Sequence, residues 1–228
     1  MKKSKIVLIL LFVFPLLMYF IFSSATHNSL FLPIISTNHN DLPVDLKPES
    51  TKDSVQLKGK ITILCFSGTN IDNIKGDLFN LNQKIYNKYN GFNDFQVVLV
   101  APNGTEKEIN TVLNAFQNLT KDTNNWNVVY GTTSAIASFY NSFNFKTPLN
   151  QDFGTSQIFI LDKEIALRGR KGKNKKGEVE YRESYNMISA ADLHNEMTDD
   201  VKILLREYRL ALKKNKNSRT KRLYIDEK

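Results

Sequence analysis

The stretch "ITILCFSGTNIDNIKGDLF", residues 61–79, reads as a buried strand followed by a loop and a helix. Residues 61–66 are apolar and rich in β-branched side chains, which is typical of a strand buried on both faces. The loop after this strand carries no catalytic side chain, although strand-to-helix loops hold the active sites of many α/β folds. The chain's single cysteine, Cys65, lies a few residues too early to belong to it. Either the site lies elsewhere in the chain, or the scaffold of an active protein has been kept without its reactive groups.

Strands and helices continue to alternate after residue 79. Apolar residues that predict one face of the first helix recur three or four positions apart, at Ile74, Leu78, Leu81, Ile85 and Tyr89. The patterns predict further strands at 95–101, 127–130 and 156–161, and further helices at 105–119, 133–143 and 197–212. We expect "EIALRG" (164–169) to form an antiparallel hairpin with the strand before it. This order predicts an α/β fold, a thioredoxin-like sandwich whose central mixed sheet is flanked by helices.

Helix-start signals accompany several of these elements. Thr105 and Glu108 have the spacing of a capping box for the second helix. Asp72 and Asp77 lie near the start of the first helix, where carboxylates complement the helix dipole. We interpret these two as capping residues and not as a catalytic acid–base pair.

The N-terminal region predicts a membrane anchor. Three lysines in "MKKSK" precede an uncharged apolar run at residues 6–22, and lysines remain on the cytoplasmic side. We expect an N-in, single-pass anchor over 1–24, with a cleaved signal peptide as the alternative. A polar, proline-containing spacer is predicted at 25–55, and a short strand near its end is an alternative to a wholly irregular segment. The folded domain is predicted at 56–214 and a basic, flexible tail at 215–228. The domain would then lie on the periplasmic side of a bacterial inner membrane.

Composition limits the remaining function classes. The 228 residues are 41% hydrophobic and 24% charged, which fits one globular domain. The formal charge of +8 arises largely from basic clusters at 168–176 and 202–228, which we interpret as a mobile loop and a solvated tail and not as a nucleic-acid site. Binding of these clusters to anionic lipid or an acidic partner is an alternative. A single cysteine excludes an intramolecular disulfide and a metal site made only of cysteines.

Several segments, taken in order, resemble the SCO/SenC family. After the apolar run come "LPII" (32–35), "LKGKITILCF" (57–66) with Thr69-Asn70, and the Trp126 to Gly131 segment; "IFILDKEIALRG" (158–169) and "DDVKILLREY" (199–208) follow. The resemblance covers about residues 32–210. It implies the fold of membrane-anchored, thioredoxin-like copper chaperones that act in cytochrome c oxidase assembly.

The resemblance breaks down at the family's copper ligands. Matching Thr69-Asn70 to the family's Thr-Asn places Ile71 and Lys75 at the two cysteines of its C-x-x-x-C motif, and Gly154 at its histidine. Cu(I) is held by soft thiolates, which these three residues do not supply. The resemblance thus implies a divergent member without catalytic, cofactor or metal residues.

We predict that this member binds a partner, an unidentified envelope protein, during assembly of a respiratory or other envelope complex. The candidate partner-binding face is the degenerate site itself: Thr69, Asn70, Ile71, Lys75, Gly154 and Thr155.

Two other sets of residues could carry chemistry. Cys65 could serve a thiol-dependent oxidoreductase or peroxidase, although its apolar neighbours favour a core residue whose thiol pKa is raised. His27, His39 and His194 lack metal-ligand spacing, and we interpret them as solvated side chains.

Overall fold

The computed structural model describes residues 11–20, 31–49, 54–120, 122–173 and 177–211, and the chain divides into two units between Leu30 and Phe31. In the first unit, residues 11–20 are helical, and the rest of the predicted anchor lies outside the described residues. No helix in the described part of the chain has both the length and the apolar character needed to cross a membrane. The predicted tail at 215–228 also lies outside the described residues.

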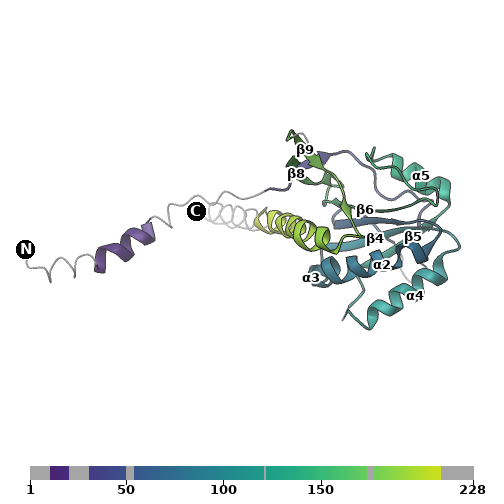
Figure 1. Ribbon diagram of the computed structural model, residues 1–228, viewed down its shortest axis with the longest axis horizontal. Helices are drawn as coiled ribbons and strands as arrows, with labels where there is room; N and C mark the ends of the chain where they lie inside the picture. Colours follow the sequence, from purple (N-terminus) through teal and green to yellow (C-terminus); the bar gives the residue numbers. More distant parts are fainter. Residues whose placement is uncertain (1–10, 21–30, 50–53, 121, 174–176, 212–228) are drawn as a thin grey trace, which may run out of the picture. The chain divides into compact units, whose positions relative to one another are not determined.

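The second unit is built around one mixed sheet (Figure 1). Strands β3, β4 and β5 are parallel, while β6 runs antiparallel to β3 on its other side. Every residue of β3 and β4 is buried, as their uninterrupted apolar sequences require. The strand order is β1-β7-β6-β3-β4-β5-β2, with β10 beside β6. The bounds are β1 Ile34–Ser36, β2 Lys47–Pro48, β3 Ile61–Ser67, β4 Phe95–Pro102, β5 Trp126–Gly131, β6 Gly154–Leu161, β7 Leu167–Arg168 and β10 Tyr185–Asn186.

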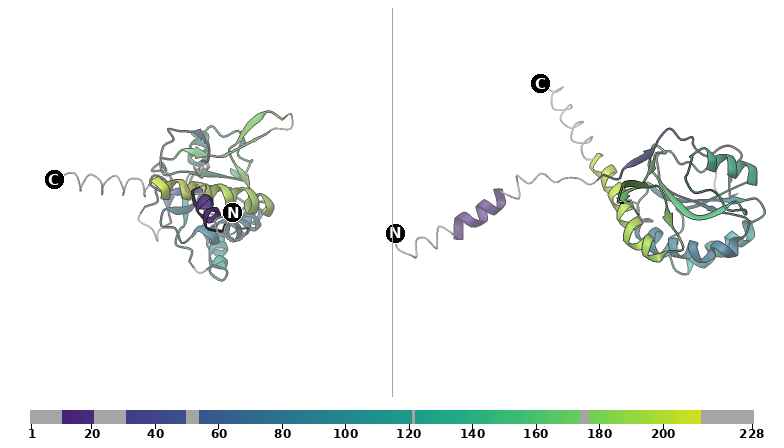
Figure 2. Two further views of the ribbon diagram at one scale, coloured as in Figure 1. Left: turned by 90° about the vertical axis from the view of Figure 1, so that its left-hand side faces the viewer. Right: turned by 45° about the horizontal axis from the view of Figure 1, so that its top comes forward.

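Helices cover both faces of this sheet (Figures 1 and 2). On one face α2 (Ile71–Leu81), α4 (Glu106–Gln117) and the C-terminal helical residues 190–211 pack into the larger core. On the other face α5 (Thr133–Asn141) packs over the smaller core. Two helices contain π-helical segments, η1 (Asn82–Tyr86), which leads into α3 (Asn87–Tyr89), and η2 (Asp192–Met197). The fold is therefore the expected thioredoxin-like sandwich.

Much of the predicted spacer at 25–55 belongs to this sheet. Strand β1 pairs with β7 and β2 pairs with β5, so residues 31–49 fold onto the domain. His39 lies within this segment: its ring stacks on Phe143 with centroids 4.5 Å apart, and its Nε2 lies 2.7 Å from Ser36 Oγ. Burial lowers the pKa of His39. The interpretation of His39 as a solvated residue was wrong, because very short strands at sheet edges give almost no hydrophobic pattern.

The predicted mobile loop at 168–176 is also largely ordered. Arg168 is 6% exposed and its guanidinium donates to Asp162 Oδ2 at 2.9 Å, to the Leu32 carbonyl oxygen and to Glu207. A second hairpin follows, formed by β8 (Arg170–Lys173) and β9 (Val179–Arg182), and residues 174–176 lie outside the described part. The cluster was misread because the carboxylates that pair with its arginines lie elsewhere in the sequence.

The capping box predicted for α4 does not form. Thr105 is the N-cap residue, but its hydroxyl donates to the Pro102 carbonyl oxygen at 2.7 Å and makes no cap hydrogen bond. Glu106 accepts from the Gly104 amide at 3.0 Å instead. Buried Thr105 thus fixes the turn between β4 and α4, and a carboxylate in the first helical turn takes up a free backbone amide.

Candidate functional site

The candidate site lies where β3 ends and α2 begins. Gly68 follows the last residue of β3 with a φ of +72°, a left-handed conformation that glycine adopts without steric cost. The loop ends at Asn70, and α2 starts with Ile71. Because β3, β4 and β5 are parallel, their carboxyl ends share the edge of the sheet at which ligands bind in open α/β folds.

Backbone from the start of β6 fills the space beside this loop. The Thr69 amide donates to the Asp152 carbonyl oxygen at 2.8 Å, and Asp152 Oδ1 accepts from the Gly154 amide at 3.2 Å. A Cβ atom at Gly154 would lie 2.8 Å from the Ser67 carbonyl oxygen and 2.9 Å from the Gly68 backbone. Position 154 therefore has no room for any side chain, including the histidine that the family places there.

The six residues predicted to form the partner-binding face divide into an exposed group and a buried group. Thr69, Asn70 and Lys75 are exposed at the end of the sheet. Ile71 is 4% exposed and belongs to the larger core, and Gly154 and Thr155 are buried in β6. Only half of the predicted set is therefore accessible to solvent, because the other half supports the loop from inside.

This arrangement does not fit a copper ion. The side chain of Ile71 is buried in the larger core, and that of Lys75 is exposed to solvent. Hydrocarbon, an ammonium group and a position without a side chain provide no soft donor for Cu(I). Among the described residues, no three His, Cys, Asp or Glu side chains are grouped as a metal site.

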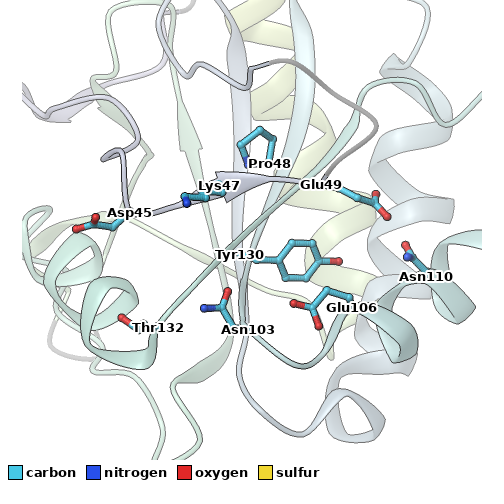
Figure 3. A pocket seen from close by; sticks show the side chains of 9 residues that line it. All are labelled: Asp45, Lys47, Pro48, Glu49, Asn103, Glu106, Asn110, Tyr130 and Thr132. Carbon is cyan, nitrogen blue, oxygen red and sulfur yellow. The ribbon is translucent and has the colours of Figure 1, made fainter.

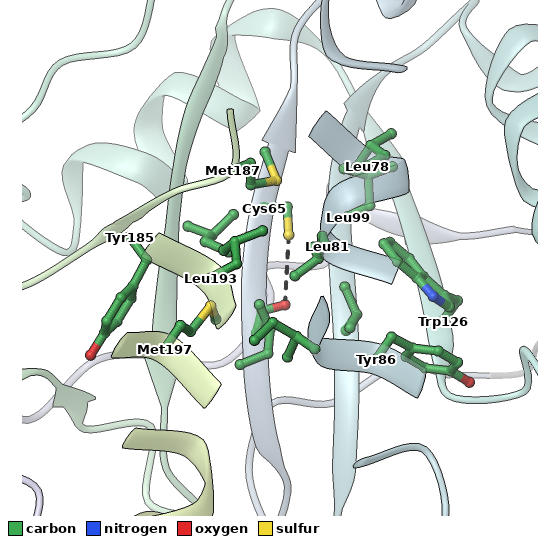
Figure 4. Close-up of a cluster of buried hydrophobic side chains, with 14 of the residues drawn as sticks. Cys65, Leu78, Leu81, Tyr86, Leu99, Trp126, Tyr185, Met187, Leu193 and Met197 are labelled. Carbon is green, nitrogen blue, oxygen red and sulfur yellow. Dashed lines mark hydrogen bonds between the residues drawn. The ribbon is translucent and has the colours of Figure 1, made fainter. Parts of the chain in front are cut away.

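Cys65 lies within the larger core (Figure 4). Its side chain is 0% exposed, surrounded by Leu78, Leu99, Leu193 and Met187, with the sulfur 4.0 Å from the Ile63 carbonyl oxygen. Burial raises the pKa of this thiol far above its ordinary value. A protonated thiol without solvent access is a poor nucleophile, so the geometry favours the interpretation of Cys65 as a core residue.

The two acidic residues near the start of α2 have different roles. Asp72 lies in the first turn, where it complements the helix dipole. Asp77 lies farther along and accepts a hydrogen bond from Ser156 Oγ at 2.8 Å, and burial raises its pKa. The interpretation of Asp77 as a capping residue was therefore wrong, since it joins α2 to β6.

Sequence reasoning missed a groove at the same edge of the sheet, beyond the ends of β4 and β5. The groove has a volume of about 620 Å³, and its lining includes Tyr130, Glu49 and Glu106. Glu49 and Glu106 belong to no motif, and Tyr130 lies in the Trp126 to Gly131 segment without being one of the residues that carry the resemblance. The only signal in the sequence is their position: Tyr130 ends the predicted strand 127–130, and Glu106 follows the predicted strand 95–101.

We compared the sequence and the fold with those of known proteins. No protein-family model and no curated protein matches the sequence. Among solved structures, an SCO1/SenC family lipoprotein from Bacillus anthracis aligns with a TM-score of 0.52 and 18% identity, over 77% of this chain and 99% of that one. BsSco, a member of the Sco family of cytochrome c oxidase assembly proteins in which a disulfide switch was identified, aligns with a TM-score of 0.51 and 14% identity, over 77% and 98% of the two chains. The chain thus has an SCO-like thioredoxin fold.

Proposed function

We propose that this protein is a membrane-anchored, extracytoplasmic protein of SCO type that binds a partner during assembly of an envelope complex and has no copper or thiol chemistry. The SCO-like fold supports the assembly role, since BsSco belongs to a family of cytochrome c oxidase assembly proteins. The lysines before residue 6 and the apolar run at 6–22 support the anchor and its orientation.

The observation that carries the proposal is the filled site at the end of β3. Ile71 is part of the core, and Gly154 touches the backbone of Ser67 and Gly68 so closely that no ligand side chain fits there. The surface that remains consists of exposed Thr69, Asn70 and Lys75. Such a surface can bind a protein through hydrogen bonds and one charge, and these groups supply no electron-transfer or metal ligand.

Site-specific photocrosslinking in intact cells tests partner binding. A benzophenone amino acid at position 70 or 75 should crosslink to one envelope protein. Asn118 provides a matched control: it is an exposed asparagine at the end of α4, and α4 leads back toward the start of β5 at the opposite edge of the sheet. Equal crosslinking from positions 70 and 118, or none from 70 and 75, would contradict binding at this face.

The orientation has its own test. A phosphatase fused after Lys228 should be active outside the cytoplasm, and the full-length product should remain in the membrane after a carbonate wash. An inactive fusion would refute the orientation, and release into the wash would refute the anchor.

A further inference from the structure

The groove beyond β4 and β5 lies one strand away from the candidate site. It has a volume of about 620 Å³ and is lined by three segments, residues 45–49 around β2, the start of α4 with Asn103, and the end of β5 (Figure 3). The Glu49 amide donates to the Val128 carbonyl oxygen at 3.2 Å, which holds the first segment against β5. The groove is therefore formed by the folded sheet edge and not by a free loop.

Tyr130 forms the inner wall of this groove with an unsatisfied polar group. Its side chain is 7% exposed, and its hydroxyl oxygen is buried with no hydrogen-bond partner among the residues that the structure describes. The hydroxyl points into the space between Glu49 and Glu106 (Figure 3). Buried hydroxyl groups in proteins are nearly always hydrogen-bonded, so an unpaired one at the wall of a groove indicates a place where a ligand atom completes the set.

The Tyr130 hydroxyl is available as a hydrogen-bond donor. Burial, and then the negative charges of Glu49 and Glu106, raise the pKa of Tyr130 well above its ordinary value. The phenol stays protonated at physiological pH, so its O–H can donate a hydrogen bond to a ligand oxygen, while its own oxygen can also accept one.

The charge around this hydroxyl favours a cation. Glu49 and Glu106 place two carboxylates on either side of the Tyr130 hydroxyl, while Asp45 and the ammonium group of Lys47 lie together on the other side of the groove (Figure 3). Neutral side chains complete the wall and can hydrogen-bond the hydroxyl groups of a ligand, namely Asn103, Asn110 and Thr132. An apolar ligand would leave these groups unpaired.

We propose that the groove binds a small vicinal amino alcohol, the chemical class to which amino sugars belong. The ammonium group lies between the carboxylates of Glu49 and Glu106, and the neighbouring hydroxyl oxygen accepts the hydrogen bond from Tyr130. Glu106 is exposed, and its carboxylate accepts from the Gly104 amide in the ligand-free protein. A rotamer change that releases this hydrogen bond gives the ligand access to the Tyr130 hydroxyl and brings the carboxylate beside the ammonium group.

Three related probes separate the features that this site recognises. Glucosamine carries both the ammonium group and the adjacent hydroxyls, N-acetylglucosamine lacks the charge, and cyclohexylamine lacks the oxygens. In calorimetric titrations of the full-length protein at slightly acidic pH, glucosamine should bind saturably with a Kd of about 1 mM or lower. The other two probes should bind at least about tenfold more weakly, because each loses one of the paired interactions.

Conservative variants test the assigned residues. Tyr130→Phe keeps the ring and removes the hydroxyl, so it should weaken glucosamine binding about five- to tenfold, and Glu106→Gln should weaken it by a similar factor. The matched control Tyr181→Phe, at an exposed tyrosine on β9, should leave binding unchanged. No saturable binding of glucosamine, equal binding of cyclohexylamine, or unchanged binding by Tyr130→Phe would each overturn the proposal. None of these outcomes bears on crosslinking from position 70.

Discussion

The carboxyl ends of two parallel strands in the same sheet have opposite characters. At the end of β3, the backbone of Ser67 and Gly68 packs so tightly against Gly154 that a single added carbon would lie within 3 Å of it. At the end of β5, Tyr130 borders a groove of about 620 Å³ and its buried hydroxyl has no partner among the described residues. Both ends belong to the edge where α/β folds hold ligands, but only the end of β5 leaves space for one.

This difference separates fold from function. The SCO-like fold places a strand end, a loop and a helix start together, while the side chains at that point decide whether chemistry follows. At the end of β3, Ile71 is buried in the core and Gly154 is in close contact with the backbone, so no space remains for a ligand. At the end of β5, polar residues around Tyr130 line an open groove. A shared fold therefore does not by itself identify which strand end binds a ligand.

Adding a side chain at the filled end should have the largest effect. Gly154→Ala should lower the free energy of unfolding by about 3 kcal/mol, because its Cβ would meet the Ser67 carbonyl oxygen at 2.8 Å. Gly91→Ala is the matched control, since a Cβ there meets nothing within 4 Å, and it should change stability by no more than about 0.5 kcal/mol. Urea unfolding measures both values, and equal stabilities would show that the end of β3 is not tightly filled.

Cys65 tests the interior of the same strand. Cys65→Ser should lower the free energy of unfolding by about 2 kcal/mol, since it buries a poorly satisfied hydroxyl, and Cys65→Ala should cost less. The native thiol should also resist alkylation near neutral pH, because it is 0% exposed and burial raises its pKa. Fast labelling of the folded protein, or a stable Cys65→Ala variant without cellular function, would favour the thiol enzyme instead.

Two buried tyrosines sharpen the comparison at the open end. The Tyr185 hydroxyl donates to Asp200 Oδ2 at 2.7 Å, so Tyr185→Phe should lower the free energy of unfolding by about 1.5 kcal/mol. Tyr130→Phe should change it by less than about 0.5 kcal/mol in the ligand-free protein, because no protein hydrogen bond is lost. Thermal denaturation distinguishes the pair, and a large loss for Tyr130→Phe would mean that its hydroxyl already has a partner.

The smallest effect is a pH dependence at Asp77. Burial raises the pKa of Asp77 in the folded protein, so the folded state binds its proton more tightly than the unfolded chain does. The contribution of Asp77 to stability is therefore fully present below its unfolded pKa and is lost as the pH rises through its folded pKa. Asp77→Asn can still accept from Ser156 and should match or slightly exceed the wild-type stability at neutral pH. Unfolding curves from acidic to neutral pH check this, and a clear destabilisation by Asp77→Asn at neutral pH would contradict it.

The sequence predicted the interior of this fold better than its edges. Strands β3 and β4 were evident because a strand buried on both faces has an uninterrupted apolar sequence. Strand β1 was missed within the spacer, and β2 was foreseen only as a short strand near the spacer's end. The two strands span three and two residues and leave no periodic pattern. Buried Arg168 was taken for a solvated charge, because its partner Glu207 lies 39 residues away.

The candidate site was partly visible in the sequence. The resemblance located Ile71, Lys75 and Gly154 at the family's ligand positions, and their chemistry followed from residue type alone. The solvent exposure of these side chains could not be predicted from residue type, because the direction of a side chain such as Ile71 depends on how the helix is rotated against the sheet. The groove could not be predicted either, since its residues come from three segments that only the folded sheet brings together.

Copper binding tests the central claim most directly. The measurement is copper retained by residues 31–228 after loading with Cu(I) in the presence of a competing chelator, with the His39→Ala variant as a control for adventitious binding. We predict no stoichiometric copper in either protein, because Ile71, Lys75 and Gly154 supply no soft donor and Cys65 is enclosed in the core. One chelator-resistant copper ion per chain in both proteins would contradict the account.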